Sequence, residues 1–530
     1  MDTFLKLFSL LIATVMLFST IIACTDNGDA KKETENNSTG VTTTATTTVN
    51  TTTTAPSTYT PPITTTASTT TSAVTTTTFV PSTNSSGEIV LPDHKWEQDI
   101  FYILGRQSNT DSSLTKFEIY RDKKSGGVID DAVWTRNQRL EQKYEFIVEQ
   151  NLVTNVNHEI TGLYNAQDDV YDLVIYSPAD ALKHAANGYL LNLKELPYIN
   201  LSHSAWDSKV NSELSINGNL YFTTNKFLLQ DKTKTYVIYH NRELVEKYKL
   251  DSLESMVTNN RWTKTEFEEI SRLHILDIDK GGAGGIGDSF GITAESYTSF
   301  VALIYGGGFT LGSNSNDGKL IRLTGPTQNN ISIIDRFGDL WFDETLLCSP
   351  KDFTSNDSSS VRNIFFDERS MFYVSNLSEA QTIFEECNFE IGVLPLPKVD
   401  KYQENYYSYV DTAKSSMLAI PCTVADPSQV SFYLEAISEE SCDTSYQGYL
   451  DYLADRLHFH KNEADKLNMI DICLNSAKYD IVRTLDPGGL YSIISQNLPQ
   501  FKTNIFNRLY NSKGHKPQIE LESFISSFED

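Results

Sequence analysis

Residues 128–148 read VIDDAVWTRNQRLEQKYEFIV, and this stretch decides the fold class. From Asp131 to Tyr144 the apolar residues recur at a helical spacing. The residues that follow, Glu145–Val148, have the pattern of a short strand. A helix that runs directly into a strand is typical of βαβ units, so the stretch predicts an α/β fold.

The alternation of strands and helices continues along the chain. A helix is expected over Thr263–Leu273, because Thr263 and Glu266 have the spacing of a capping box. After Asp426 the strand pattern fades, which predicts a helical C-terminal region. The further expected strands are Asp172–Tyr176, Tyr236–Tyr239, Phe290–Thr293, Met371–Val374, Glu390–Leu394 and Ser416–Ile420, and the expected C-terminal helices cover Val430–Ile437, Tyr446–Leu457, Ala464–Asn475 and Glu520–Phe528.

Length and charge limit the classes of protein that fit. The chain has 530 residues, of which about 440 have a globular composition, too many for a single core, so two domains or lobes are expected. The formal net charge is −26. A charge this negative repels phosphate backbones, which argues against a nucleic-acid partner.

The N-terminus has the features of an export signal. A largely apolar run from Leu7 to Phe18 is followed by Ile-Ile-Ala-Cys at residues 21–24, which resembles the lipobox of bacterial lipoproteins. The resemblance implies a signal peptide over residues 1–23, a lipid on Cys24, and a location on the outer face of the cytoplasmic membrane. The alternative is an uncleaved membrane-anchor helix, which also places the rest of the chain outside the cell.

Residues 24–88 are expected to form a disordered linker. The centre of this segment, residues 41–79, is almost entirely Thr, Ser, Ala and Pro. Such a composition has no apolar periodicity and cannot bury enough surface to fold. A flexible spacer and a glycosylated stalk are both compatible with it.

Several short segments beyond residue 95 carry a family resemblance. Among them are YDLVIYSP at Tyr171–Pro178, IGVLPLPK at Ile391–Lys398 and MLAIP at Met417–Pro421. Others are Val128–Tyr144, Gly188–Phe222, Tyr236–Leu250 and Arg261–Ile270. In order and spacing, these segments resemble the extracellular solute-binding proteins of ABC importers, in the carbohydrate-type family 1.

The resemblance implies a two-lobed, periplasmic-binding-protein-like fold of type II, with a hinge and a ligand cleft between the lobes. Lobe 1 is expected at residues 95–232 plus 396–430, and lobe 2 at residues 236–392 plus 431–530. The implied partners are a small-molecule ligand and the permease subunits of an ABC importer. The chain is expected to be a monomer that has no cofactor and no enzymatic activity.

Aromatic and acidic side chains are the candidate ligand-binding residues. A sugar presents apolar CH faces and hydroxyl groups, so its site needs flat rings and planar polar groups. Trp206 and Asp207 are the first choice, because an indole beside a carboxylate offers both. The further candidates are Tyr176, Tyr221, Tyr305, Tyr373, Tyr409 and Asp411. For each tyrosine the alternative is ordinary core packing with a satisfied hydroxyl.

Other patterns that suggest a metal or a disulfide are weaker. Asp277, Asp279 and Asp288 are spaced as in a calcium loop, but the twelfth position lacks the bidentate Glu, so a glycine-rich turn is favoured. His458 and His460 have no third ligand nearby in the sequence. We therefore expect no metal site. The five cysteines after Cys24 are expected mainly as small buried residues, with a Cys442–Cys473 disulfide as one open possibility.

The leading hypothesis is a lipid-anchored protein that captures a sugar or oligosaccharide and delivers it to an ABC permease. A surface carbohydrate-active enzyme is one alternative, although the sequence contains no Gly-x-Ser-x-Gly or His-Glu-x-x-His motif. A sensory or adhesive sugar-binding module is another, because the Thr-rich spacer is longer than an importer requires.

Overall fold

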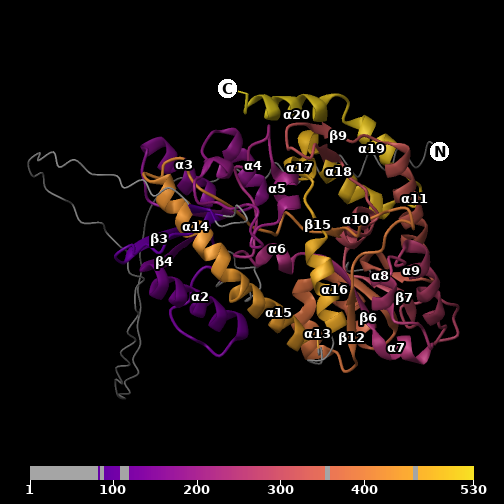
Figure 1. Cartoon of the computed structure of the whole chain (residues 1–530). Coiled ribbons are helices and arrows are strands. Elements are labelled where there is room, and N and C mark those ends of the chain that lie inside the picture. Colours follow the sequence, from indigo (N-terminus) through magenta and orange to yellow (C-terminus); the bar gives the residue numbers. More distant parts are fainter. Residues whose placement is uncertain (1–81, 84–88, 108–117, 353–357, 458–463, 530) are drawn as a thin grey trace, which may run out of the picture. The chain divides into compact units, whose positions relative to one another are not determined.

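Two β-sheets carry the fold (Figure 1). The computed structural model describes residues 82–83, 89–107, 118–352, 358–457 and 464–529. The described residues all belong to one compact unit.

The first sheet has four strands in the order β14-β5-β3-β4. They are β3 (Asp99–Arg106), β4 (Phe146–Val153), β5 (Leu173–Tyr176) and β14 (Met417–Ala419). The central strand β3 is parallel to both β4 and β5, whereas β14 is antiparallel to β5. The whole of β5 is buried, as expected for a strand that is covered on both faces.

The second sheet has five strands in the order β10-β7-β11-β6-β12. They are β6 (Tyr236–Asn241), β7 (Phe290–Ala294), β10 (Leu347–Cys348), β11 (Ser370–Asn376) and β12 (Ile391–Leu394). β7 is parallel to β10 and β11, and β6 is antiparallel to β11 and β12.

The two sheets share one plan. Each sheet contains three parallel strands, which are β3, β4 and β5 in the first sheet and β7, β10 and β11 in the second. In both sheets the earliest of the three in the chain lies between the other two, and an antiparallel strand pairs with the last of them. The antiparallel strand is β14 in the first sheet and β6 in the second. In both cases it is the strand with which the chain enters that sheet after leaving the other one. The strands thus require two passages of the chain between the sheets, and a third follows when helix α16 (Ala464–Asn475) packs on β12 of the second sheet. The predicted α/β class is confirmed.

Helix α2 (Val128–Tyr144) ends where Glu145 adopts a left-handed conformation, with φ of 57°. Helices α14 (Pro427–Cys442) and α15 (Ser445–Arg456) lie along α2 (Figure 1). The Tyr433 ring of α14 lies 4.5 Å from the Phe146 ring of β4, measured between centroids. Residues just beyond 430, where lobe 1 was expected to end, thus pack on the first sheet. The exact lobe boundaries stay a prediction.

The remaining elements are shorter or cover the sheets. The other helices are α3 (Val156–Ala166), α4 (Pro178–Ala186), α5 (Ser208–Leu214), α6 (Gln230–Thr233), α7 (Arg242–Lys247), α8 (Leu253–Thr258), α9 (Lys264–Ser271), α10 (Tyr297–Gly306), α11 (Gln328–Trp341), α12 (Ser358–Phe366), α13 (Ala380–Glu386), α16 (Ala464–Asn475), α17 (Ile481–Leu485), α18 (Leu490–Asn497), α19 (Phe506–Ser512) and α20 (Lys516–Ser526). Three strand pairs complete the set: β1 (Ser82–Thr83) with β2 (Ile89–Val90), β8 (Gly312–Asn314) with β9 (Ile321–Leu323), and β13 (Ser408–Tyr409) with β15 (Ala477–Lys478).

All seven predicted strands are present, with ends that differ by a few residues. The sequence reading missed β3, the central strand of the first sheet. Helix α9 begins at Lys264 as expected, but the capping box was wrong. The Thr263 hydroxyl donates to the Glu266 carboxylate, so neither side chain caps the helix backbone.

Several N-terminal predictions lie outside the described residues. These are the signal peptide at residues 1–23, the lipidated Cys24, and most of the linker at residues 24–88. His458 and His460 also lie outside them. Among the residues that are described, no helix is long and apolar enough to cross a membrane.

The cysteines carry no disulfide within the described part of the chain. Cys348, Cys387, Cys422, Cys442 and Cys473 are all free. The possible Cys442–Cys473 disulfide is therefore wrong. Cys348, Cys387 and Cys473 are buried, as expected for small residues in the core.

Candidate ligand-binding site

A cavity of about 740 Å³ is the main candidate site. One wall is helix α5, which follows the first sheet in the chain, with Lys209 and Glu213. A second part of the lining is residues 310–316, which lie in the chain between β7 and β10 of the second sheet and bond directly to α5 through Asn314 and Asn316. Residues 404–407 and 475–481 complete the lining. We call this space the main cavity.

Tyr407 is the aromatic centre of the main cavity. Its ring centroid lies 5.3 Å from Lys209 Nζ and 4.7 Å from Lys478 Nζ. Two ammonium groups therefore lie against the π-system of one ring, an arrangement that stabilises the ring's position. Tyr479, in the same lining, donates its backbone N–H to Glu213 Oε2 at 2.6 Å.

Burial shifts the pKa values of two ionisable side chains in the main cavity. It raises the pKa of Glu213 to about 7, and it lowers the pKa of Lys478. Near neutral pH the Glu213 carboxyl therefore exists in both forms, so it can donate as well as accept a hydrogen bond. Asn314 donates its Nδ2–H to Ser215 O at 2.7 Å, and its buried Oδ1 has no partner among the described residues.

Asp480 holds the wall at residues 310–312 in place. Its Oδ1 accepts the backbone N–H groups of Val482 and Arg483, which caps α17. Its Oδ2 accepts the backbone N–H of Leu311 at 2.8 Å and of Gly312 at 3.2 Å. A Cβ at Gly312 would lie 2.2 Å from Val482 Cγ2, so only glycine fits this close approach.

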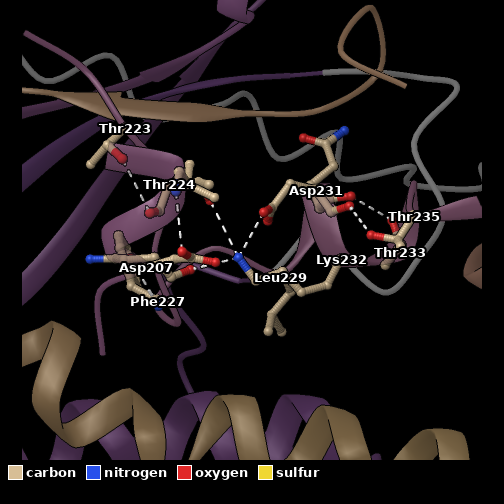
Figure 2. Close-up of polar contacts among 12 residues, drawn as sticks. Asp207, Thr223, Thr224, Phe227, Leu229, Asp231, Lys232, Thr233 and Thr235 are labelled. Carbon is tan, nitrogen blue, oxygen red and sulfur yellow. Dashed lines mark hydrogen bonds and ion pairs between the residues drawn. The ribbon is translucent and has the colours of Figure 1, made fainter. Parts of the chain in front are cut away.

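A second cavity of about 280 Å³ shares Asn475 and Tyr479 with the main cavity, and we call it the adjoining cavity. Its polar lining includes Lys232, whose Nζ lies 2.7 Å from Asp231 Oδ2 and 3.4 Å from Thr224 Oγ1 (Figure 2). Asp231 is 3% exposed, and its Oδ1 has no hydrogen-bond partner within the described part of the chain. A hydroxyl donor from a ligand would satisfy this oxygen.

Comparison with solved structures supports the assignment of the fold. No family model and no curated protein matches the sequence. UspC of M. tuberculosis superimposes with a TM-score of 0.54 at 13% identity, over 79% of this chain and 100% of that one. A second similar structure is the galacto-N-biose-/lacto-N-biose I-binding protein of an ABC transporter from Bifidobacterium longum, in complex with lacto-N-biose. It superimposes with a TM-score of 0.52 at 10% identity, over 81% of this chain and 98% of that one.

The chain has the fold of an ABC-importer solute-binding protein. The two-lobed α/β fold that the sequence predicted is confirmed. The Bifidobacterium longum protein is a binding protein of an ABC transporter.

Within this solute-binding fold, Trp206 and Asp207 line the adjoining cavity. Asp207 also caps α5, because its Oδ1 accepts the backbone N–H of Lys209 at 2.9 Å and of Val210 at 3.1 Å. The Trp206 indole is 5% exposed, and its Nε1–H donates to Glu435 Oε2 at 3.0 Å. Of the sequence candidates, the structure brings these two to a common cavity.

The five candidate tyrosines lie elsewhere in the described structure. Tyr305 and Tyr409 are 1% and 2% exposed, their ring centroids lie 5.5 Å apart, and both contact Arg483, whose guanidinium is 5.0 and 4.5 Å from the two centroids. Tyr176 and Tyr373 are buried in the two sheets, at 1% and 0% exposure.

The last two candidates have local partners. Tyr221 is partly buried with its ring 5.2 Å from that of Phe528. Asp411 accepts the backbone N–H of Ala413 at 3.2 Å.

Sequence reasoning missed the residues that line the main cavity. Lys209 and Glu213 are spaced i, i+4, and the signal that could have found them is their position on the short helix directly after Trp206 and Asp207. Tyr407 and Lys478 are brought together from distant parts of the chain by pairing of β13 with β15. No local pattern in the sequence encodes that pairing.

Proposed function

We propose that the protein is a lipid-anchored extracellular binding protein that captures a sugar or an oligosaccharide and delivers it to an ABC permease. The observation that carries this proposal is the main cavity, because its lining combines α5, which follows β5 of the first sheet in the chain, with residues 310–316, which lie between β7 and β10 of the second sheet. A ligand that contacts both walls couples its binding to the arrangement of the two halves.

The chemistry of the lining supports a sugar. Tyr407 offers a flat ring for an apolar CH face, and Asn314 and Glu213 offer planar polar groups for hydroxyls. A volume of about 740 Å³ lies in the range of small-molecule sites. The adjoining cavity adds the Trp206 indole and the unpaired oxygen of Asp231, which gives room for a further sugar ring.

The similarity to the Bifidobacterium longum protein supports the same class of ligand, since that protein is bound to lacto-N-biose. In our proposal the ligand shifts an equilibrium between open and closed forms, and the permease recognises the closed form. The lipid on Cys24 keeps the protein on the outer face of the cytoplasmic membrane, and residues 24–88 act as the spacer.

The test is thermal unfolding of the purified protein with mono- and oligosaccharides, and with peptides as controls. A ligand at about 100 times its dissociation constant adds about 2.7 kcal/mol to the free energy of unfolding. We expect a shift with one class of sugar, and chromatography should detect no product. A shift followed by breakdown of the sugar would identify a carbohydrate-active enzyme. A shift with peptides alone would overturn the sugar assignment.

A further inference from the structure

His203, Glu435 and Glu439 form a cluster outside both cavities. Glu435 and Glu439 lie one turn apart on α14, and His203 comes from the segment just before Trp206. One potential ligand atom from each of the three side chains lies within 4.8 Å of the others. Two carboxylates and an imidazole at this spacing make a donor set for a divalent transition-metal ion.

Glu435 supplies a second, independent observation, because one of its carboxyl oxygens lacks a hydrogen-bond partner among the described residues. The residue is 0% exposed. Its Oε2 accepts the Asn200 backbone N–H at 2.9 Å and the Trp206 indole N–H at 3.0 Å. Its Oε1 is buried and has no hydrogen-bond partner in the described chain. An unsatisfied buried carboxylate oxygen is costly, and a bound cation removes that cost.

Two of the three side chains line a neighbouring cavity. This cavity of about 320 Å³ is lined by His203 and Glu439, together with Lys143 and Cys442, whereas Glu435 is buried and is not part of the lining. Cys442 is seven residues after Glu435, on the same face of α14. Lys143 is a rival cation for Glu439, since the two interact electrostatically. The Glu435 Oε1 atom has no such partner.

We propose that His203, Glu435 and Glu439 bind a first-row divalent transition-metal ion such as Zn²⁺. His203 Nδ1 accepts the Ala205 backbone N–H at 3.3 Å. A metal ion on Nδ1 takes the lone pair that accepts this hydrogen bond, and a metal ion on Nε2 requires a proton on Nδ1. In either case this long hydrogen bond is lost when the ion binds. Water completes the coordination from the adjacent cavity.

The site would also support the wall of the adjoining cavity. Glu435 binds the ion through one oxygen and the Trp206 indole through the other. A carboxylate in such a bridge is oriented by its hydrogen-bond donors, and in turn fixes the position of the indole. Metal binding and its tests do not depend on the identity of the cavity ligand.

The experiment is titration of Zn²⁺ into the purified, chelator-treated protein, followed by calorimetry and by tryptophan fluorescence. The wild type should bind one ion at this site with a change in fluorescence. In His203→Ala and in Glu435→Gln the affinity should fall by about tenfold or more. Glu435→Gln keeps an acceptor for Asn200 and Trp206, so its fold is preserved; if it nevertheless fails to fold, His203→Ala decides.

Two control variants separate this site from its rivals. Asp279→Asn alters the acidic cluster of Asp277, Asp279 and Asp288, whose carboxylates accept backbone N–H groups of their own loop. Lys143→Ala removes the rival cation. Both should bind Zn²⁺ at least as tightly as the wild type. No binding by the wild type, or equal affinity in the wild type and His203→Ala, would overturn the proposal.

Discussion

Burial decides what a single acidic residue does in this protein. The chain carries 69 Asp and Glu residues, and most acidic side chains of any protein remain in water. Asp172 is an exception, because it is largely withdrawn from water and its Oδ2 accepts the Tyr102 backbone N–H at 2.7 Å. Its charged neighbours, Asp169 and Asp99, carry the same sign. Ionisation of such a group weakens the folded state.

Asp172→Asn should therefore make the protein more stable at alkaline pH. Burial is the main reason that the pKa of Asp172 rises from 3.8 to about 7. Because the pKa is raised in the folded state, the protonated Asp172 contributes to the free energy of unfolding. This contribution is fully present below pH 3.8 and is lost as the pH rises through 7. We expect urea unfolding to give the variant an advantage of about 2 kcal/mol at pH 8 and much less at pH 4.5. Asp122→Asn, at an exposed position, is the control, and an equal advantage at both pH values would contradict the prediction.

Tyr407→Ala should weaken the binding of the sugar that stabilises the protein. The ring is the aromatic surface that Lys209 and Lys478 flank in the main cavity. We expect an approximately tenfold rise in the dissociation constant, about 1.4 kcal/mol, measured by calorimetry. Tyr407→Phe keeps the ring and should bind nearly as well as the wild type. Full affinity in the alanine variant would remove Tyr407 from the site.

At the scale of elements, local pattern determined much of the fold. Periodicity placed α2, and α16 was predicted over its full length at Ala464–Asn475. β3 was missed although the signal was present, since Asp99–Arg106 contains the apolar run Ile100–Leu104 and the polar, turn-type residues 108–113 follow it. The pairing of β13 with β15 joins residues almost seventy positions apart, so only tertiary structure reveals it.

Asp480→Asn should destabilise α17 and the wall that it supports. The carboxylate accepts backbone N–H groups from both α17 and residues 311–312, and an amide presents its own N–H groups to some of these donors. We expect a loss of about 3 kcal/mol in the free energy of unfolding, measured in urea. Asp426→Asn is the matched control, since Asp426 caps α14 alone; because Asn is about as good an N-cap as Asp, this variant should lose less than about 0.5 kcal/mol. Equal losses of stability in the two variants would mean that Asp480 acts only as a helix cap, and would contradict its role in joining α17 to residues 311–312.

At the scale of the whole molecule, the site could not be predicted from the sequence. Trp206 and Asp207 were chosen because an indole beside a carboxylate is a local feature, and the structure places both in the lining of the adjoining cavity. The tyrosines were chosen by residue type, and type does not distinguish the buried Tyr373 from the cavity-lining Tyr407. That distinction depends on which segments the passages of the chain between the sheets bring together.

Binding of the sugar should make the protein more compact. The main cavity has walls from chain segments of both sheets, so one ligand that contacts α5 and residues 310–316 holds the two halves in a single arrangement. We expect the radius of gyration in small-angle X-ray scattering to fall when the sugar is added at saturating concentration, together with the rise in thermal stability. Tyr407→Ala at the same sugar concentration should show a smaller change in both, because fewer molecules are occupied. A sugar that raises the unfolding temperature without changing the radius of gyration would show that it binds to one half alone, and closure would then not be the mechanism.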